Sequence, residues 1–408
     1  MSTAASSEPS PAAPATPELS KRVQAVSPSI TLAVSNKAKS LRSQGIDVVS
    51  FGAGEPDFNT PTFIKDAAKE ALNANMTRYS TSNGIPALRE VIAEKFQKDN
   101  ALPYGPEQIM VGPGGKGVLY FAMLALLNDG DEVLMPTPYW VSYPEQAKLC
   151  GGVPTFVEGD ESRDFKLTPE QLDAAITEKT KIFILNSPSN PAGNCYSPEE
   201  LTALGKVLEK HPQVTVFSDE IYEKLLYDGQ QTASIAALVP SLQSRTITFN
   251  CHSKTYAMTG WRIGYLAAPA DFVESLTEPR HTLSINTCTI SQHAALAALT
   301  GPQDEVEGHF AAYAERRAYL MEAASALGLR YGAPGGAFYL YTDVSSTGLS
   351  GAAFCEALLR ETGVLIFPGD LFGDPGSDFV RISYLQPLPR LREAMERIGG
   401  FMRSVEAA

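Results

Sequence analysis

Short apolar runs rich in β-branched residues alternate with longer helical patterns through the middle of the chain. Strands that alternate with helices in this way are typical of a mainly parallel sheet with crossover helices. The expected strands are Gln108–Val111, Glu132–Met135, Lys181–Leu185, Val214–Phe217, Thr246–Phe249 and Ile263–Leu266. The pattern predicts an α/β domain in which ligands collect beyond the carboxyl ends of the strands.

The pattern changes after about residue 305. There we expect a charged helix over 311–327, a strand over 337–341, a helix over 352–361 and a strand over 379–383. We therefore expect a large domain over 61–304 and a smaller α+β domain over 305–408. The segment 19–60 is polar-helical and then extended, and is expected to pack with the smaller domain. Residues 1–18 are mostly Ser, Ala, Pro and Thr, a composition that predicts a disordered tail.

Composition narrows the class of protein. The 408 residues are 44% hydrophobic and 19% charged, which is typical of a globular protein with more than one domain. A net charge of -13 disfavours a nucleic-acid partner, because the phosphate backbone would be repelled. No apolar run reaches the roughly 18 residues of a membrane helix, so no membrane partner is expected. Five scattered cysteines, without metal-ligand spacing, predict a reducing cytoplasm and no bound metal.

A glycine-rich turn, Gly112–Gly117, follows the first expected strand and opens an apolar helix. Its backbone N–H groups and the helix N-terminus could hold a phosphate. The turn satisfies G-x-G-x-x-G, but no acid ends the next strand, where a dinucleotide fingerprint would place one. Three interpretations of this turn remain open at this point: a phosphate-binding loop, a plain tight turn without a ligand, or part of the cofactor site of a nicotinamide-dependent dehydrogenase.

An acid and a lysine follow two further strands. Asp219 closes one strand, and it is either a buried, paired carboxylate or the N-cap of a helix over Ile221–Leu226. Lys254 lies just past another strand. It is either an amine in the crevice that forms a Schiff base or a solvated lysine on the surface. An anion cradle, a carboxylate and an amine are the three groups that pyridoxal 5′-phosphate requires.

Several longer motifs occur in order along the chain: Gly52–Phe58, Arg78–Tyr79 with Gly84–Arg89, Pro138–Tyr143, Asn186–Gly193, Ser218–Tyr222, Ser253–Tyr265 and Phe379–Ser383. With these motifs the chain resembles, from about Lys21 to Arg403, the class I pyridoxal-phosphate aminotransferases of the aspartate aminotransferase family. The resemblance is closest to the bacterial branch of aspartate and prephenate aminotransferases. It implies fold type I, with a mainly parallel seven-stranded sheet and a smaller α+β domain, in a homodimer with active sites at the subunit interface.

The resemblance also implies residue roles. Lys254 would form the Schiff base with the cofactor and carry the proton between Cα and C4′. Residues implied to bind the cofactor are Gly115, Lys116, Trp140, Asn190, Asp219, Tyr222, Ser253, Arg262 and, from the neighbouring subunit, Tyr79. Residues implied to bind the substrate are Gly54, Trp140, Asn190, Arg381, Thr31 and Lys116. Taken singly, Trp140 could be core, Tyr79 a loop anchor and Arg381 a strand-edge charge. Cys251-His252 departs from the Gly and apolar residue more usual in relatives.

The implied reaction is a ping-pong transfer of an amino group from an L-amino acid to a 2-oxo acid. One branch of the family reads a distal carboxylate with an arginine in a region that corresponds to His281–Gln292, and no arginine stands there. Lys116 and Thr31 stand where the bacterial branch has its substitutes, which favours L-aspartate with 2-oxoglutarate. Ser27 replaces a lysine of the best-matching relatives and weakens a role for prephenate. Transfer from alanine, aromatic or other amino acids, and a β-lyase on the same scaffold, remain alternatives.

Overall fold

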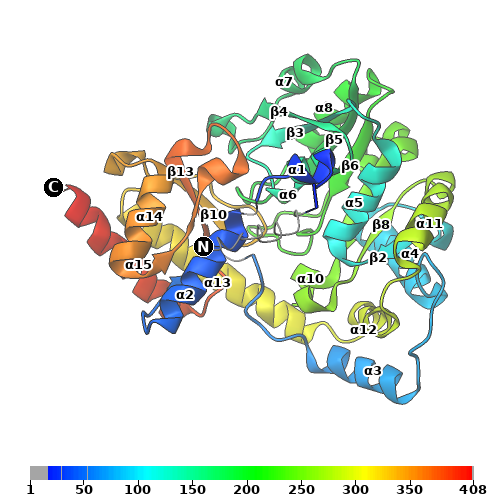
Figure 1. The fold of residues 1–408 in the computed structure, drawn as a ribbon, viewed down its shortest axis with the longest axis horizontal. Coiled ribbons are helices and arrows are strands. Elements are labelled where there is room, and N and C mark those ends of the chain that lie inside the picture. The colour runs from blue at the N-terminus through cyan, green and yellow to red at the C-terminus, as the bar shows by residue number, and fades with distance from the viewer. Residues whose placement is uncertain (1–16, 29, 53, 407–408) are drawn as a thin grey trace, which may run out of the picture.

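The computed structural model describes residues 17–28, 30–52 and 54–406, shown as coloured ribbon in Figure 1. The predicted tail, residues 1–18, lies outside these ranges except for its last two positions. In the described part of the chain, no helix is both long and apolar enough to cross a bilayer.

A seven-stranded sheet forms the centre of the larger part of the molecule. Its strands lie in the order β2 (Ile109–Gly112), β8 (Gly264–Ala267), β7 (Thr246–Cys251), β6 (Thr215–Asp219), β5 (Thr180–Asn186), β3 (Glu132–Thr137) and β4 (Val153–Glu158). Only β8 runs antiparallel to its neighbours, β2 and β7. The other pairings are parallel, so the predicted mainly parallel seven-stranded sheet is confirmed.

Helices cover both faces of this sheet because its central strands are apolar on both sides. In β5, Ile182 and Ile184 face one core while Phe183 and Leu185 face another. The first face is covered by α5 (Gly114–Leu126), α6 (Ser142–Leu149) and α11 (Ala270–Ser284). The opposite face is covered by α3 (Thr62–Asn73), α4 (Pro86–Asn100), α12 (Thr289–Thr300), α7 (Pro169–Ala175) and α8 (Pro198–Glu209). The short helices α9 (Ile235–Leu238) and α10 (His252–Thr255) lie in connections.

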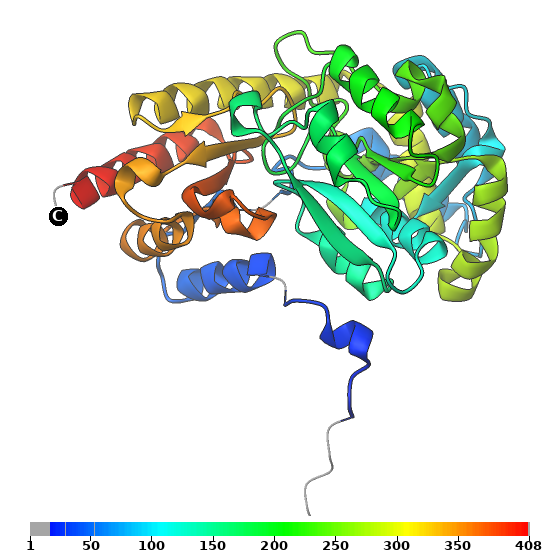
Figure 2. The same cartoon turned by 90° about the horizontal axis from the view of Figure 1, so that it is seen from above.

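A second, antiparallel sheet forms the C-terminal part. Its order is β12 (Phe367–Pro368), β13 (Phe379–Ser383), β10 (Tyr339–Asp343) and β9 (Arg330–Tyr331). It packs with α13 (Asp304–Ala326), α14 (Gly351–Thr362) and α15 (Leu388–Glu406). Figure 2 shows α13, in yellow, running from the larger part to the C-terminal part. The helix joins the two cores: Val306, near its start, packs in the larger part, and Leu320 packs in the C-terminal part.

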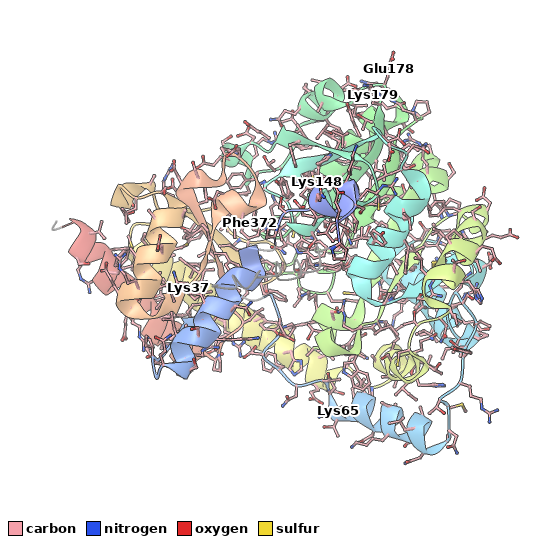
Figure 3. The ribbon with its side chains drawn as sticks, in the orientation of Figure 1. Lys37, Lys65, Lys148, Glu178, Lys179 and Phe372 are labelled. Atoms are coloured by element: carbon pink, nitrogen blue, oxygen red, sulfur yellow. The ribbon has the colours of Figure 1, made fainter. Side chains whose placement is uncertain are left out.

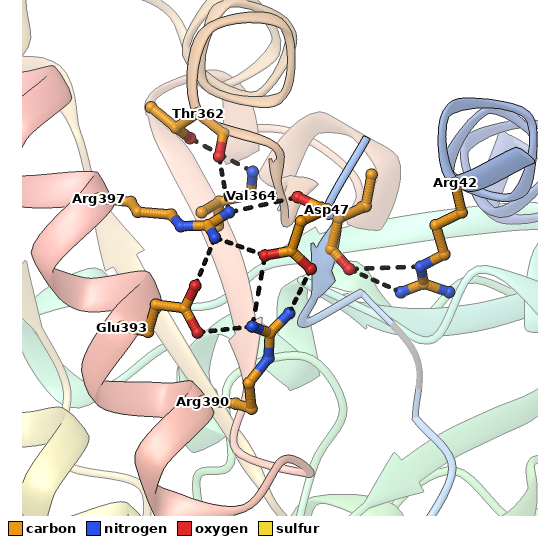
Figure 4. A network of polar contacts seen from close by, with 8 residues as sticks. Arg42, Asp47, Thr362, Val364, Arg390, Glu393 and Arg397 are labelled. Atoms are coloured by element: carbon orange, nitrogen blue, oxygen red, sulfur yellow. Dashed lines mark hydrogen bonds and ion pairs between the residues drawn. The ribbon is translucent and has the colours of Figure 1, made fainter. Parts of the chain in front are cut away.

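The N-terminal segment lies against the C-terminal part of the chain. It contains α1 (Lys21–Gln24), α2 (Ile30–Ser43) and β1 (Val49–Ser50), and β1 pairs in parallel with β11 (Val364–Leu365). Figure 4 shows the polar network at this junction: Asp47 accepts hydrogen bonds from Arg390 at 2.8 Å and from Arg397 at 2.5 Å. These bonds lower the pKa of Asp47 to about 2. The network fastens the segment that leads into β1 onto α15.

The sequence placed most elements correctly but missed some details. All six expected strands of the large sheet are present, and β13 has the predicted bounds. The edge strand β4 was not predicted from the pattern. The alternative that Asp219 caps a helix over Ile221–Leu226 is wrong: residues 221–224 form turns, and Leu226 forms an isolated bridge with Gly336. The strand expected from Ala337 begins at Tyr339, because Ala337 has a positive φ of 58°.

Candidate active site

A cavity of about 660 Å³ lies where the large sheet meets the C-terminal part. Strands β5 and β6 end beside it, as expected for a parallel sheet. Phe372, labelled in Figure 3 between the two parts, lines it from the C-terminal side. The predicted site residues that line the cavity are Gly54, Lys116, Trp140, Asn190, Asp219, Tyr222, Lys254 and Arg381. The fold thus gathers residues that are up to 327 positions apart in sequence, from Gly54 to Arg381.

Asp219 is the last residue of β6 and is only 1% exposed. Burial raises the pKa of its carboxyl to about 6, although hydrogen bonds and Lys254 counteract this effect. The main hydrogen bond comes from the hydroxyl of Tyr143, which donates to Asp219 Oδ2 at 2.5 Å. The backbone N–H of Ile221 donates to Oδ1 at 3.4 Å. The carboxyl is therefore buried at the cavity wall with one strong donor that favours its ionised form.

Lys254 lies on α10, which begins directly after β7. Its ammonium donates a hydrogen bond to the backbone carbonyl of Gly54 and lies 5.7 Å from the centre of the Phe338 ring. Among the described residues, no carboxylate forms an ion pair with Lys254. The amine therefore faces the cavity, held by a neutral acceptor rather than by an acid.

The glycine turn between β2 and α5 packs tightly against Arg262. Gly114 has a φ of +80°, and a Cβ there would lie 2.5 Å from Nη2 of Arg262. A Cβ on Gly264 would lie 2.5 Å from the amide nitrogen of Gly115. These close approaches explain why glycine occupies both positions. They also bring the Arg262 guanidinium to the N-terminal end of α5.

Lys116, in the first turn of α5, adds a second cation to this corner. Burial lowers the pKa of Lys116, and the charges of Arg262 and Lys254 lower it further. The Lys116 ammonium lies 5.0 Å from the centre of the Trp140 ring. Within the described ranges, neither Lys116 nor Arg262 has a carboxylate partner. Unpaired cations around a helix N-terminus form a site for an anion.

Arg381 projects from β13 into the opposite side of the cavity and is 4% exposed. It donates to Asn190 Oδ1 at 2.8 Å and to the Gly52 carbonyl at 2.5 Å. Its guanidinium stacks within 4.4 Å of the Tyr339 ring centre. Burial lowers the pKa of Arg381, and its Nε has no hydrogen-bond partner in the described structure. The geometry suits a guanidinium kept ready for an external carboxylate.

Tyr222 and Asn190 lie between the lysine side and the arginine side. The hydroxyl of Tyr222 is 3.1 Å from that of Tyr339, and burial raises the pKa of Tyr222 well above its usual value. The backbone N–H of Asn190 donates to Asn186 Oδ1 at 3.0 Å, and Asn186 Nδ2 donates to the Asp219 carbonyl at 2.9 Å. The ends of β5 and β6 are thereby tied to each other at the cavity wall.

Two predicted site residues are not brought to this cavity by the chain itself. Tyr79 is 79% exposed and lines a separate hollow of about 640 Å³ together with Cys288. Thr31 belongs to α2, but its side chain lies outside the described part of the structure. Gly115, Ser253 and Arg262 adjoin cavity residues without lining the cavity themselves.

Sequence reasoning did not single out Tyr143, Tyr339 or Phe372. Tyr143 lies inside the quoted motif Pro138–Tyr143, and its place in that motif is the signal that could have found it. No sequence signal marks Tyr339 or Phe372, since their roles depend on packing around Arg381. Ser27 was noted, and its backbone N–H donates to Glu145 Oε2 at 2.7 Å at the cavity mouth.

Comparison with known proteins identifies the family. Residues 46–398 match the model of the aminotransferase class I and II family. The chain is 47% identical to an aspartate aminotransferase of Bacillus sp. strain YM-2, over 94% of this chain and 99% of the relative. It is also 47% identical to an aspartate/prephenate aminotransferase of Cereibacter sphaeroides, over 94% and 98% of the two chains.

Solved structures give the same answer. The crystal structure of an aspartate aminotransferase from Rhizobium meliloti superimposes with a TM-score of 0.91 at 38% identity, covering 95% of this chain and 99% of the other. An aspartate aminotransferase from Thermus thermophilus with maleate gives a TM-score of 0.90 at 41% identity, covering 94% and 100%. The chain belongs to the aminotransferase class I and II family, and it is an aminotransferase of the aspartate aminotransferase type. The alternative of a nicotinamide-dependent dehydrogenase is thereby dismissed.

Proposed function

We propose that this aminotransferase binds pyridoxal 5′-phosphate in the cavity and transfers the amino group of L-aspartate to 2-oxoglutarate. The observation that carries the proposal is the pairing of a cavity-facing amine, Lys254, with a buried carboxyl, Asp219, in one cavity of about 660 Å³. Relatives named aspartate aminotransferase, at 47% and 48% identity over nearly the full chain, support the choice of aspartate.

The residues present fit the cofactor. Lys116 and Arg262, unpaired with any described carboxylate, would hold its phosphate with the N–H of Gly115 and the hydroxyl of Ser253. Asp219 would accept from the ring nitrogen, because a carboxylate is the group that keeps a pyridine protonated. Tyr222 and Asn190 are proposed to contact the hydroxyl of the cofactor ring, and Trp140 is proposed to pack against the face of that ring.

When bound, the cofactor would supply an electron sink for the electrons left at the substrate Cα. Lys254 would take the proton from the substrate Cα and return one at C4′ of the cofactor, as a general base and then as a general acid. Asp219 would hold a proton at the ring nitrogen. Arg381 binds the α-carboxylate through two parallel N–H groups, which orients the Cα–H bond toward Lys254. Glycine at position 54 leaves room for the Tyr339 hydroxyl, which a Cβ there would strike, and its bare backbone would lie beside the substrate.

Lys116 and Thr31 are the proposed readers of the distal carboxylate of aspartate. Lys116 lines the cavity and carries no described ion pair, so its charge is available to a dicarboxylic substrate. The segment His281–Gln292 contains no arginine that could bind this distal carboxylate. The distal carboxylate would therefore bind at the N-terminal end of α5, beside the proposed phosphate site.

We also propose a homodimer in which Tyr79 of one chain reaches the phosphate site of the other. Tyr79 is exposed, and it lies near Leu72 and Met76 in the sequence, which are 52% and 46% exposed apolar residues. Exposed apolar side chains that gather on one segment are typical of a protein interface. The five cysteines are all free thiols, which supports the proposal of a reducing, cytoplasmic location.

Absorption spectroscopy tests the function directly. The purified protein should carry a visible absorption band of bound pyridoxal phosphate, and L-aspartate in a single turnover should convert it to the pyridoxamine form faster than alanine or phenylalanine does. The Lys254→Ala variant should lose turnover while keeping its fold. A matched control is Lys37→Ala, which removes an exposed lysine of α2, labelled in Figure 3. Near-wild-type transamination by Lys254→Ala would refute the assignment.

A further inference from the structure

The turn that follows β6 presents side chains in two opposite directions. Asp219 and Tyr222 line the cavity. Glu220 and Glu223, from the same turn, are 3% and 4% exposed and do not line it. They contact residues of α4 and of the segment that leads into α9 instead. Two carboxyls are therefore buried directly behind the residues proposed to hold the cofactor.

Glu220 makes hydrogen bonds to three separate parts of the chain. Its Oε1 accepts from the Ser218 hydroxyl at 2.8 Å, within β6. Its Oε2 accepts from the Ser234 hydroxyl at 2.7 Å, just before α9. The same Oε2 is 3.0 Å from Nδ2 of Asn100, the last residue of α4. The side chain thus ties the turn to α4 and to the α9 segment. No other feature of the proposed mechanism uses these contacts.

The charges of this cluster do not balance if both acids are ionised. Lys95 forms an ion pair with Glu223 and also donates to Asn100 Oδ1 at 2.7 Å. One ammonium therefore serves two buried carboxyls. Asn100 bridges them, because its Nδ2 is also 2.7 Å from Glu223 Oε2. A buried carboxylate without a cation is costly, and such a group is neutralised by a proton instead.

The other titratable groups that face this cluster supply no second cation. His252, from α10, is buried and carries no charge, since burial and Lys95 lower its pKa to about 3. Tyr104, after α4, stays neutral, because burial raises its pKa to about 12. Asp219, on the cavity side of the same turn, is a further acid. Burial, and then the charge of Glu223, raise the pKa of Glu220 to about 7.

We propose that Glu220 is a positioning residue that acts as a neutral carboxylic acid, fixing the turn that carries Asp219 and Tyr222 to α4 through Asn100 and Ser234. The inference rests on the proposed function for its effect on turnover, but the protonation state of Glu220 does not depend on it. As a neutral acid Glu220 carries one O–H, so one of the two serine hydroxyls, Ser218 or Ser234, accepts from it instead of donating. The turn is then held without a second negative charge beside Asp219.

The test compares two substitutions at this position in the holoenzyme. Glu220→Gln keeps the length, the neutrality and the acceptor of the acid. Glu220→Asp keeps the acid but is too short to reach both Asn100 and Ser234. A displacement of about 1 Å in a catalytic group costs up to about a hundredfold in rate. We expect Glu220→Asp to lower kcat by tenfold or more and to weaken retention of pyridoxal phosphate, with KM changed far less. At pH 6, where the acid is mostly protonated, Glu220→Gln should stay within about threefold of wild type.

Infrared difference spectroscopy reads the protonation state without reference to activity. Wild type minus Glu220→Gln at pH 6 should show a carboxylic-acid carbonyl band, which fades as the pH rises through about 7. The absorption of Asp219 cancels in this difference spectrum, because Asp219 is present in both proteins. A matched control is Glu223→Gln, which leaves Lys95 unpaired and should lower the melting temperature by several degrees, whereas Glu220→Gln should not.

Two results would overturn the proposal by showing that Glu220 acts as an ionised carboxylate. One is the absence of the carboxylic-acid band at pH 6, and the other is a loss of activity in Glu220→Gln as large as in Glu220→Asp. Wild-type activity in Glu220→Asp would show that it positions nothing. If Glu220→Asp does not fold, the Gln variant and the infrared band still decide. A wild-type protein that shows the band but does not transaminate would refute the proposed function alone.

Discussion

Tyr143→Phe is the substitution that most directly tests the electrostatics of the cavity wall. The tyrosine hydroxyl donates to Asp219 at 2.5 Å, and the two side chains are 2% and 1% exposed. A hydrogen bond to a charged group contributes about 1.5 to 3 kcal/mol, so its removal should reduce kcat/KM roughly 10- to 100-fold. Phenylalanine keeps the ring and its edge contact with Trp140, whose ring centre lies 5.2 Å away.

The effect should also depend on pH. The Tyr143 hydrogen bond is the main interaction that lowers the pKa of Asp219, which burial raises to about 6. Without this donor the pKa rises further, so a larger fraction of Asp219 is protonated at pH 6 than at pH 8. We therefore expect a greater loss of kcat/KM at pH 6 than at pH 8, with the acidic limb of the profile moved to higher pH.

Steady-state kinetics with aspartate and 2-oxoglutarate at saturating pyridoxal phosphate, from pH 5.5 to 9, measure both effects. Tyr120→Phe, in α5, is the control, because no hydrogen bond from its hydroxyl is found among the described residues. A uniform loss at every pH would mean that Tyr143 acts only through packing. An unchanged kcat/KM would show that the Tyr143–Asp219 hydrogen bond does not contribute to catalysis.

Three further predictions concern the same cavity. Asp219→Asn should retain cofactor but lose far more than tenfold in kcat, because an amide cannot hold a protonated ring nitrogen; a smaller loss, measured by steady-state kinetics, would contradict the assigned role. Lys116→Ala should reduce kcat/KM roughly ten- to a hundredfold more for aspartate than for alanine, and an equal loss on both donors would leave Lys116 with the phosphate alone. Arg381→Lys should raise KM for amino acids of every side chain, since lysine cannot form the bidentate pair with the α-carboxylate; substrate titrations at fixed 2-oxoglutarate check this, and an unchanged KM would exclude that pairing.

The sequence was informative where local pattern and tertiary structure agree. Six of the seven strands of the large sheet are mostly buried on both faces, so their apolar runs stand out, and all six were expected. Strand β4 was missed because it lies at the sheet edge, where Val153 and Phe156 are about half exposed and the run Val153–Glu158 contains Pro154. A helix after Asp219 was one of two alternatives. The segment instead forms turns, and Leu226 pairs with Gly336 in an isolated bridge, a tertiary contact that the local sequence pattern does not show.

The site was predictable to the extent that single residues follow strands. Lys254 and Asp219 could be singled out because each comes directly after a buried run. The aromatic surroundings of Arg381 could not, since Phe367, Phe372 and Tyr339 meet it only through the packing of three separate segments. The role of Glu220 was equally hidden, because Glu220 stands beside Asp219 in one motif and faces the other way.

The pairing of β1 with β11 has a consequence for how the protein is made. Val49 meets Val364, 315 residues later in the chain, so the ribosome releases β1 long before its partner exists. The large sheet, whose strands end at Ala267, can form first, because domains fold as they emerge. Closing so long a loop is slow, since its entropy must be lost before the contact forms. Gly52 and Gly54, just beyond β1, and Arg381, beyond β11, therefore reach the cavity only when synthesis is nearly complete. The newly made chain therefore places Lys254 and Asp219 before it places Gly54 and Arg381, the residues proposed to bind the substrate.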